Sequence, residues 1–346
     1  MRSYLVLICI LNLSTAVFAV DLETYCKEAF KQRSQSKEAV LNGGFYKERK
    51  SYETSRIKYN KRRYLGCRFD TPWMSDLYNQ LCTEGMVNES YDVNNLNNIK
   101  LPELILFFFD GMSDFNASLG KENLKAVNLD GSEGNDLGVG NANGQKALNQ
   151  SLETLSKNVP RLMEKVEIHY HPGSGLHRRE NYDSAMACAA HSKDAIEVLE
   201  AITGKERHIK WSSIGFSNGG YLATEFQNEV TKSGIEIDLA FSIDPVVQTL
   251  YYPFKMSDEF VGQRNEKTKR FINYFQDSHI LPNSPIQIHR GRPVKNADRN
   301  INLSSAEYAD LLGSPYDDHV QMPESEIVRN ALTCELSDLL NLSVCK

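Results

Sequence analysis

The chain has few of the features that mark specialised protein classes. It contains no internal repeat and no C-x-x-C pair, which argues against a thiol-redox or structural zinc role. Beyond the first twenty residues, no stretch approaches the roughly 18 apolar residues of a membrane-spanning helix. The formal net charge is −6, so a general nucleic-acid-binding surface is not expected. The composition, 41% hydrophobic and 24% charged over 346 residues, is that of a globular protein with one large domain or two small ones.

The first twenty residues predict an export signal. Arg2 supplies a short positive region, residues 4–11 are apolar, and residues 17–19 (Val-Phe-Ala) read as a small-residue cleavage site. The apolar run is short for a bilayer span. We therefore expect a signal peptide over residues 1–19, cleavage near Ala19, and a mature protein that is periplasmic or extracellular.

The cysteine count agrees with export. Of the 7 cysteines, Cys9 lies in the signal, and an even number remains. In an exported chain this predicts disulfides, although the sequence does not choose among the 15 pairings that six cysteines allow. The alternative is that some cysteines stay free and buried, as Cys188 would in its apolar helical run. The six are Cys26, Cys67, Cys82, Cys188, Cys334 and Cys345.

Residues 20–100 are polar and interrupted. Within them, residues 47–63 carry eight Lys or Arg against two acidic residues. Such a run is typical of a solvated helix face, and its alternative role is attraction to a phosphate-bearing membrane or a polysaccharide. Because the stretch has few apolar runs for a core of its own, we expect an N-terminal elaboration packed on a main domain at 101–346.

From residue 101 onward, apolar strands alternate with helices. Residues 104–109 form a continuous apolar run that ends at Asp110 and Gly111, as in a central strand buried on both faces. The alternation predicts an α/β fold with a mostly parallel, doubly wound sheet. Further strands are expected at 166–171, 209–215, 237–243 and 271–275, and helices at 147–157, 184–202 and 325–340.

A long loop is expected at residues 116–145, which are rich in Asn and Gly. Its acidic segment at 130–136 lacks the spacing of an EF-hand, so it is interpreted as loop rather than as a calcium site.

The sharpest motif is Gly215-Phe216-Ser217-Asn218-Gly219, which fits G-x-S-x-G. It follows an apolar strand and precedes a helix, which is the context the motif requires. A nucleophilic serine must sit on a tight strand-to-helix turn, and its neighbours two positions away must lack bulk. The following helix N-terminus favours developing negative charge. The alternative is an ordinary glycine-rich turn.

A serine nucleophile needs a base, and His319 is the best candidate. It lies after the last expected strand, just before the final helix, which matches the order Ser, acid, His. His279 and His289 also follow the serine but lie nearer the fifth strand and the loop after it. The alternative for His319 is a surface histidine paired with Asp317 or Asp318.

The acid is assigned to Asp244, at the end of the strand that follows the nucleophile helix. A carboxylate there lies at the carboxyl edge of the sheet, where α/β sites form. A turn or N-cap aspartate is the alternative. His169 and His171 share one strand face and suggest a two-histidine metal site, but no third ligand is evident. No metal is assigned.

These residues resemble the α/β-hydrolase superfamily, and an acid after the strand following the nucleophile resembles pancreatic-type lipases. A longer resemblance covers residues 101–225. It is to a bacterial hydrolase family with a DGT-N loop, a Y-x-P-G-x-G loop and a GFSRGA elbow, which includes type VI secretion phospholipase effectors. Met112 replaces the threonine of that family, and Asn218 replaces its arginine. The matching segments are 108–111, 158–162, 170–175 and 214–220.

The expected chemistry is ester hydrolysis through Ser217, His319 and Asp244. The oxyanion hole should use the backbone N–H of Asn218 and one from Gly111 or Met112. No metal or organic cofactor is implied. The expected partner is a small-molecule or lipid ester, with a membrane surface or envelope as a further contact and no nucleic acid.

Two alternatives stay open at this point. A peptidase, a polysaccharide deacetylase or an acyltransferase would use the same triad. A catalytically inactive, hydrolase-like binding protein would retain its function without Ser217.

Overall fold

The computed structural model describes residues 21–42, 71–112, 143–173, 178–246, 260–276, 291–305, 319 and 322–345. Within that part, residues 21–35, 71–100 and 191–207 form one compact unit and the remainder forms a second. The signal peptide expected at 1–19, the basic run at 47–63 and the loop expected at 116–145, up to residue 142, lie outside the described residues. The boundary expected at residue 100 and the packing of 20–100 on a main domain stay predictions.

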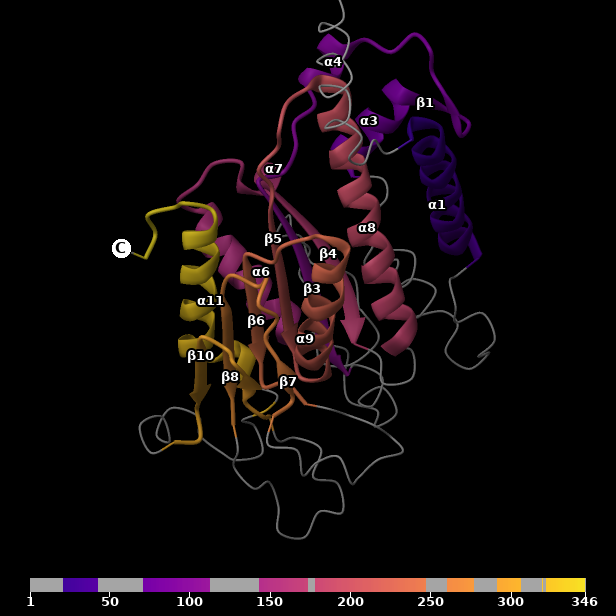
Figure 1. The fold of residues 1–346 in the computed structure, drawn as a ribbon. Helices are drawn as coiled ribbons and strands as arrows, with labels where there is room; N and C mark the ends of the chain where they lie inside the picture. The colour runs from indigo at the N-terminus through magenta and orange to yellow at the C-terminus, as the bar shows by residue number, and fades with distance from the viewer. Residues whose placement is uncertain are drawn as a thin grey trace, which may run out of the picture. The chain divides into compact units, whose positions relative to one another are not determined.

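The second unit is built on a six-stranded sheet with the order β10-β8-β6-β5-β3-β4 (Figure 1). Every pairing in it is parallel. This confirms the predicted α/β class with a parallel, doubly wound sheet. The strands are β3 (Leu104–Met112), β4 (Val166–Gly173), β5 (Lys210–Phe216), β6 (Leu239–Ile243), β8 (Phe271–Phe275) and β10 (Arg299–Asn302).

The inner strand β3 is apolar because both of its faces are covered. Leu106 and Phe108 belong to the core cluster on one face of the sheet. On the other face, Phe107 and Phe109 pack against Phe226, with ring centroids 4.7 and 5.3 Å apart. Side chains alternate between the two faces of a strand, so a continuous apolar run is the sequence of a strand buried on both sides. The prediction for this segment is confirmed.

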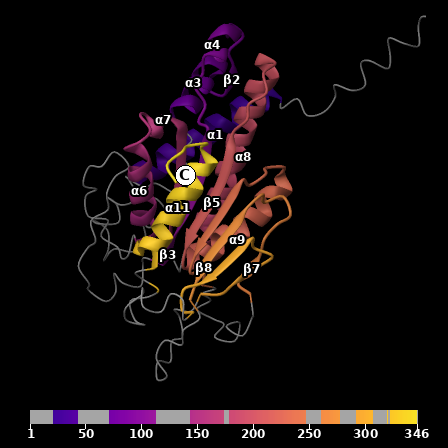
Figure 2. The ribbon, with the colours of Figure 1, turned by 90° about the vertical axis from the view of Figure 1, so that its left-hand side faces the viewer.

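Helices cover both faces of this sheet (Figures 1 and 2). On one face lie α6 (Asn143–Ser156) and α11 (Glu326–Leu339), whose buried leucines belong to the same core cluster as Leu106 and Phe108. On the other face lie α9 (Asn218–Val230) and the part of α8 (Arg178–Thr203) that belongs to this unit. Shorter elements of the unit are α7 (Leu162–Lys165), η3 (Thr231–Ser233), β7 (Gly262–Gln263), β9 (Val294–Lys295) and η6 (Met322–Glu324).

The strand order creates a switch point between β3 and β5. The chain leaves β3 toward β4 on one side and leaves β5 toward β6 on the other. In an open parallel sheet, the crevice at the carboxyl ends of two such strands is the usual ligand site. Gly111 lies at the carboxyl end of β3, and Ser217 follows β5 directly.

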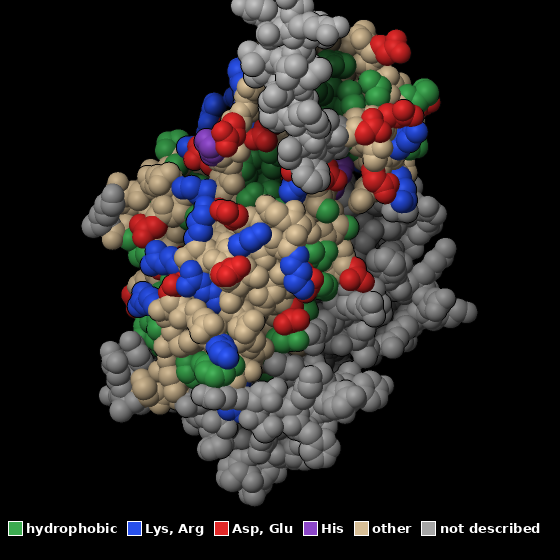
Figure 3. Space-filling model, viewed as in Figure 1, with side chains coloured by type: hydrophobic (Ala, Val, Ile, Leu, Met, Phe, Trp, Pro, Cys, Tyr) green, Lys and Arg blue, Asp and Glu red, His purple; other side chains and the backbone are tan. Residues whose placement is uncertain are grey.

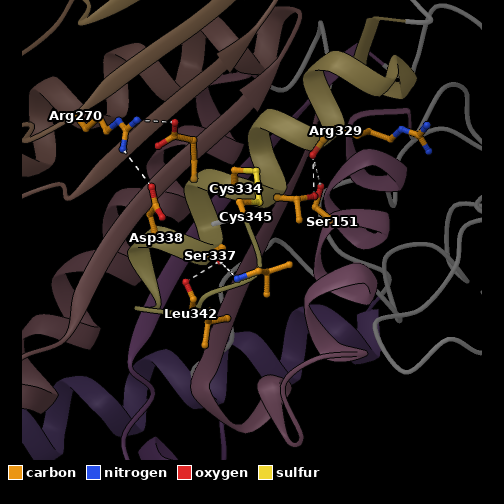
Figure 4. Close-up of a disulfide and its surroundings, with 11 residues drawn as sticks. Ser151, Arg270, Arg329, Cys334, Ser337, Asp338, Leu342 and Cys345 are labelled. Atoms are coloured by element: carbon orange, nitrogen blue, oxygen red, sulfur yellow. Dashed lines mark hydrogen bonds and ion pairs between the residues drawn. A yellow bond between two sulfur atoms is a disulfide. The ribbon is translucent and has the colours of Figure 1, made fainter.

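A disulfide joins α11 to the C-terminal segment (Figure 4). Cys334 and Cys345 are bonded, and Ser337 Oγ donates to the carbonyl oxygen of Leu342 at 3.1 Å. The even cysteine count thus predicted disulfides correctly. Cys26 is bonded to Cys82, and Cys188 is disulfide-bonded as well, so none of these five is a free thiol; Cys67 lies outside the described residues.

Replacing both Cys334 and Cys345 with serine should lower the free energy of unfolding. The bond closes a loop of 11 residues, for which loop-closure entropy gives about 3 kcal/mol. Urea unfolding of the double variant beside the oxidised wild type measures the difference. A variant as stable as the wild type would show that the C-terminal segment contributes no stability through this bond.

The first unit is organised around its own disulfide and a small apolar core. Cys26 of α1 (Leu22–Asn42) is bonded to Cys82 of β1 (Cys82–Thr83). Trp73, Leu77 and Leu81, on one side of α3 (Pro72–Leu81), are buried. The unit also contains β2 (Met86–Val87), which pairs antiparallel with β1, and α4 (Val93–Asn97). A disulfide compensates for the limited core that a unit of this size can bury.

Charges of both signs are interspersed over the described surface (Figure 3). Lys269 Nζ lies 2.8 Å from Asp238 Oδ1, and Arg270 lies 2.8 Å from Glu335. In both pairs the basic side chain is exposed, whereas the carboxylates of Asp238 and Glu335 are largely buried. None of the helices in the described ranges is both long and apolar enough to cross a membrane.

Candidate active site

Ser217 occupies a tight turn between β5 and α9. Its backbone has φ 56° and ψ −125°, a conformation that costs of order 1–3 kcal/mol in a non-glycine residue. Two backbone hydrogen bonds hold the turn. Ser217 N–H donates to the carbonyl oxygen of Ile243 at 2.9 Å, and Val246 N–H donates to the carbonyl oxygen of Ser217 at 3.0 Å. The predicted strand, turn and helix around this serine are all present.

The two glycines of the motif are required by close backbone contacts. A Cβ at Gly215 would lie 2.2 Å from the carbonyl oxygen of Gly219, and a Cβ at Gly219 would lie 2.1 Å from that of Phe109. Real Cβ atoms do not approach an oxygen this closely. Both glycines of G-x-S-x-G are therefore needed because α9 packs closely on the ends of β3 and β5.

Asp244 follows β6 and is completely buried. Its backbone has φ 44°, and its N–H donates to the carbonyl oxygen of Tyr274 at 2.6 Å. Gln276, also fully buried, donates from its backbone N–H to Asp244 Oδ1 at 3.0 Å and from Nε2 to Oδ2 at 3.2 Å. A Cβ at Gly291 would lie 1.8 Å from Asp244 Oδ1, so only glycine fits there. The carboxylate is fixed on several sides.

His319 connects the other two residues. Its Nδ1 lies 2.5 Å from Asp244 Oδ2, and its Nε2 lies 2.8 Å from Ser217 Oγ. Because a carboxylate only accepts, Nδ1–H is the donor to Asp244, and Nε2 is then the acceptor for the hydroxyl of Ser217. The ring is 6% exposed and stacks on Phe216 with centroids 5.2 Å apart. The fold thus brings together three residues separated by 102 and 75 positions.

Two of the expected oxyanion donors, Asn218 and Gly111, lie beside this serine. Asn218 is the first residue of α9, where backbone N–H groups have no acceptor within the helix. Gly111 lies close to Ser217, since a Cβ at Gly111 would be 3.0 Å from Ser217 Cβ. Gly111 N–H donates to Asp110 Oδ1 at 2.8 Å and is therefore engaged. Of the two amides expected from this strand end, that of Met112 is the better candidate.

Sequence reasoning missed several residues that hold this site. Gln276 and Gly291 touch Asp244 from distant parts of the chain, and no local pattern points to them. Asp110 stands in one of the matching segments noted above, but its contact with Tyr170 depends on the pairing of β3 with β4.

His169 and His171 lie on the face of β4 that packs against Phe107 and Phe109. His169 Nε2 lies 2.6 Å from Glu167 Oε1, and its Nδ1 lies 3.3 Å from Cys188 Sγ. His171 stacks on Phe109 with ring centroids 5.1 Å apart, and both of its ring nitrogens are buried without a hydrogen-bond partner. In the described part of the chain, no three His, Cys, Asp or Glu side chains gather as metal ligands would.

His171 should make the protein less stable in acid. Burial, and to a smaller extent the charge of His169, lowers the pKa of His171 to about 3 from 6.5. Between these values the unfolded chain binds a proton that the folded chain does not, so the free energy of unfolding falls as pH falls through 6.5. From pH 6.5 to 4.5 this single group accounts for about 2 kcal/mol, because the change per pH unit reaches 1.4 kcal/mol only once the unfolded histidine is fully protonated.

Urea unfolding of wild type and His171→Phe at pH 7.0 and 4.5 checks this prediction. Phenylalanine keeps the aromatic packing on Phe109 and cannot take up a proton. The variant should lose less stability in acid than the wild type does. Equal losses would show that His171 is protonated in the folded state or does not control acid stability.

No protein-family model and no curated relative matches the sequence. Among solved structures, the chain is similar to lipase B of Aspergillus fumigatus, with 12% identity and a TM-score of 0.30, over 74% of this chain and 58% of that one. It is also similar to the Tle1 effector bound to the VgrG spike of the type 6 secretion system, with 12% identity and a TM-score of 0.26, over 70% of this chain and 61% of that one. The chain spans about three fifths of the length of these two structures.

Proposed function

We propose that the chain is an exported serine hydrolase that cleaves carboxylic esters through an acyl-enzyme. The observation that carries the proposal is the hydrogen-bonded series Ser217, His319 and Asp244 at the carboxyl edge of the sheet. An ordinary glycine-rich turn needs neither a histidine at 2.8 Å from the serine hydroxyl nor a buried carboxylate behind that histidine. Together they supply a nucleophile, a base and a group that orients the base.

In the proposed acylation, Ser217 Oγ attacks the ester carbonyl while His319 Nε2 takes its proton. The imidazolium that forms is stabilised by Asp244, which is buried and fixed by Gln276. The backbone N–H groups of Asn218 and Met112 receive the oxyanion. His319 then gives the proton to the leaving alkoxide, and the acyl group remains on Ser217.

In the proposed deacylation, water replaces the alcohol. His319 takes a proton from the water as its oxygen attacks the acyl carbonyl, and a second tetrahedral oxyanion forms in the same place. When it collapses, the carboxylic acid leaves and the proton returns to Ser217 Oγ. The cycle needs no metal and no organic cofactor.

Export is part of the proposal, and the disulfides support it. Disulfides form and persist in oxidising compartments, which include the periplasm and the extracellular space. The Cys26–Cys82 and Cys334–Cys345 bonds are each formed within one compact unit.

Labelling with a fluorophosphonate, followed by mapping of the adduct, tests the proposal. These reagents react with a serine that its base has activated, so the label is expected on Ser217. Matched p-nitrophenyl esters and anilides of graded chain length, a phospholipid and an acetylated polysaccharide then separate an esterase from a peptidase or a deacetylase. A folded protein that is neither labelled nor active on any ester would overturn the proposed function.

A further inference from the structure

Asp110 is a buried carboxylate at the carboxyl end of β3. It is 2% exposed. Its Oδ1 accepts the backbone N–H of Gly111 at 2.8 Å, and its Oδ2 accepts the hydroxyl of Tyr170. Tyr170 belongs to β4, the neighbouring parallel strand, and stacks on Phe108 with ring centroids 5.6 Å apart. The proposed reaction does not use this carboxylate as a base or a nucleophile.

The start of α6 also packs against Asp110. A Cβ at Gly144, the second residue of the helix, would lie 2.7 Å from Asp110 Oδ1 and 2.8 Å from Phe216 Cβ. Glycine therefore lets the first turn of α6 approach both the carboxylate and the residue before the proposed nucleophile. The N-terminus of a helix favours a negative charge. Asp110 is thus held by β3, β4 and the first turn of α6.

The contact with Gly111 controls the direction of a backbone amide. Since Gly111 N–H points at the Asp110 carboxylate, it cannot also point at an oxyanion on Ser217. The contact fixes the peptide between Asp110 and Gly111, and so limits the orientation of the next peptide, whose N–H belongs to Met112. This strand end lies directly against the serine, because a Cβ at Gly111 would be 3.0 Å from Ser217 Cβ.

We propose that Asp110 and Tyr170 are positioning residues that direct the N–H of Met112 toward the oxyanion. The inference rests on the proposed function and adds the residues that orient one donor of the oxyanion hole. Neither residue touches the substrate: Asp110 acts through the backbone of 110–112, and Tyr170 acts through Asp110.

Fluorophosphonate kinetics with Tyr170→Phe tests this inference, because the phosphonyl oxygen occupies the oxyanion hole. The variant removes one hydroxyl and keeps the stacked ring. Removal of a direct oxyanion donor costs about 10²–10³-fold in rate, so loosening one indirectly should slow labelling about tenfold. The number of sites labelled at completion should stay one per chain, and ester hydrolysis should show a lower kcat with an unchanged KM. Asp110→Asn, which keeps the shape and one acceptor oxygen, should slow labelling as well.

Ser212→Ala is the matched control. Ser212 Oγ donates to the carbonyl oxygen of Leu239 at 2.9 Å, and the residue is fully buried near the opposite end of β5. This variant also loses one buried hydroxyl, and its labelling rate should equal that of the wild type. A purely structural role for Tyr170 would lower the number of labelled sites in Tyr170→Phe and leave the rate per site unchanged.

The outcomes separate the two proposals. Wild-type rates in both Tyr170→Phe and Asp110→Asn, fewer labelled sites at an unchanged rate, or equal slowing in Ser212→Ala would each overturn the inference alone. A wild-type protein that is not labelled at all would overturn the proposed function and this inference together.

Discussion

Ser217→Ala should abolish fluorophosphonate labelling and lower kcat for ester hydrolysis by about 10⁶-fold, as loss of the nucleophile does in serine proteases. Alanine has no oxygen to attack the carbonyl, and the backbone turn stays the same because the neighbouring glycines are unchanged. His319→Ala should have an effect of similar size, since the hydroxyl would lose the acceptor 2.8 Å away. Because the two residues act as one unit, the double variant should be no worse than either single variant.

Ser213→Ala is a suitable control for that result. Ser213 lies on β5, the strand that leads into Ser217. It is fully buried, and its Oγ has no hydrogen-bond partner. Its removal should change neither labelling nor thermal stability by much, whereas loss of labelling in this variant would point to nonspecific damage to β5. Full ester hydrolysis by folded Ser217→Ala would contradict the assignment of Ser217 as the nucleophile.

The turn at Ser217 and the inner strands were predictable because the sequence patterns that mark them are local. The run at 104–109 is apolar at every position, and it forms most of β3, which pairs with β4 on one side and β5 on the other. A Cβ at Gly215 or Gly219 would lie 2.1–2.2 Å from a backbone carbonyl oxygen. The two glycines of the motif therefore indicate that α9 packs closely on the strand ends. His319 and Asp244 could be assigned because their positions relative to the last strand and to the nucleophile helix follow from chain order alone.

Other parts of the fold carry no such signal. The edge strand β10, at Arg299–Asn302, has the sequence Arg-Asn-Ile-Asn, and all four residues are exposed or partly exposed. Ile301 is its only apolar residue, and one apolar residue does not mark a strand, so the sequence predicts only the five strands before it. The helix α8 starts at Arg178, six residues before the expected start, because residues 178–183 are polar in sequence and lack the apolar spacing that predicts a helix.

The residues that support the site were not predictable for a different reason. Gln276 reaches Asp244 across 32 positions, and Gly291 matters only because Asp244 lies against it. Both depend on the relative placement of strand ends. A sequence can indicate which side chain is the acid, but the contacts that orient the acid appear only when β6 and β8 are paired.

Asp244→Asn should lower kcat by about 10⁴-fold with little change in the fold, as in the protease triad. The carboxylate accepts from His319 Nδ1 at 2.5 Å and thereby keeps the neutral Nε2 facing Ser217. The amide that replaces it can turn its NH₂ toward Nδ1, which then becomes the acceptor and leaves the proton on Nε2. In that tautomer the imidazole cannot take the proton of the serine hydroxyl. The amide also carries no charge to stabilise an imidazolium.

Asp238→Asn supplies a matched control on the same strand. Asp238 precedes β6 as Asp244 follows it, and its Oδ2 accepts the backbone N–H of Trp211 at 2.9 Å. The same carboxylate-to-amide change there should alter stability alone, so kcat per labelled site should equal that of the wild type. Equal activities of Asp244→Asn and Asp238→Asn would show that Asp244 holds the strand end and does not orient His319. In that case, the proposed mechanism would reduce to a serine and histidine pair without an essential acid.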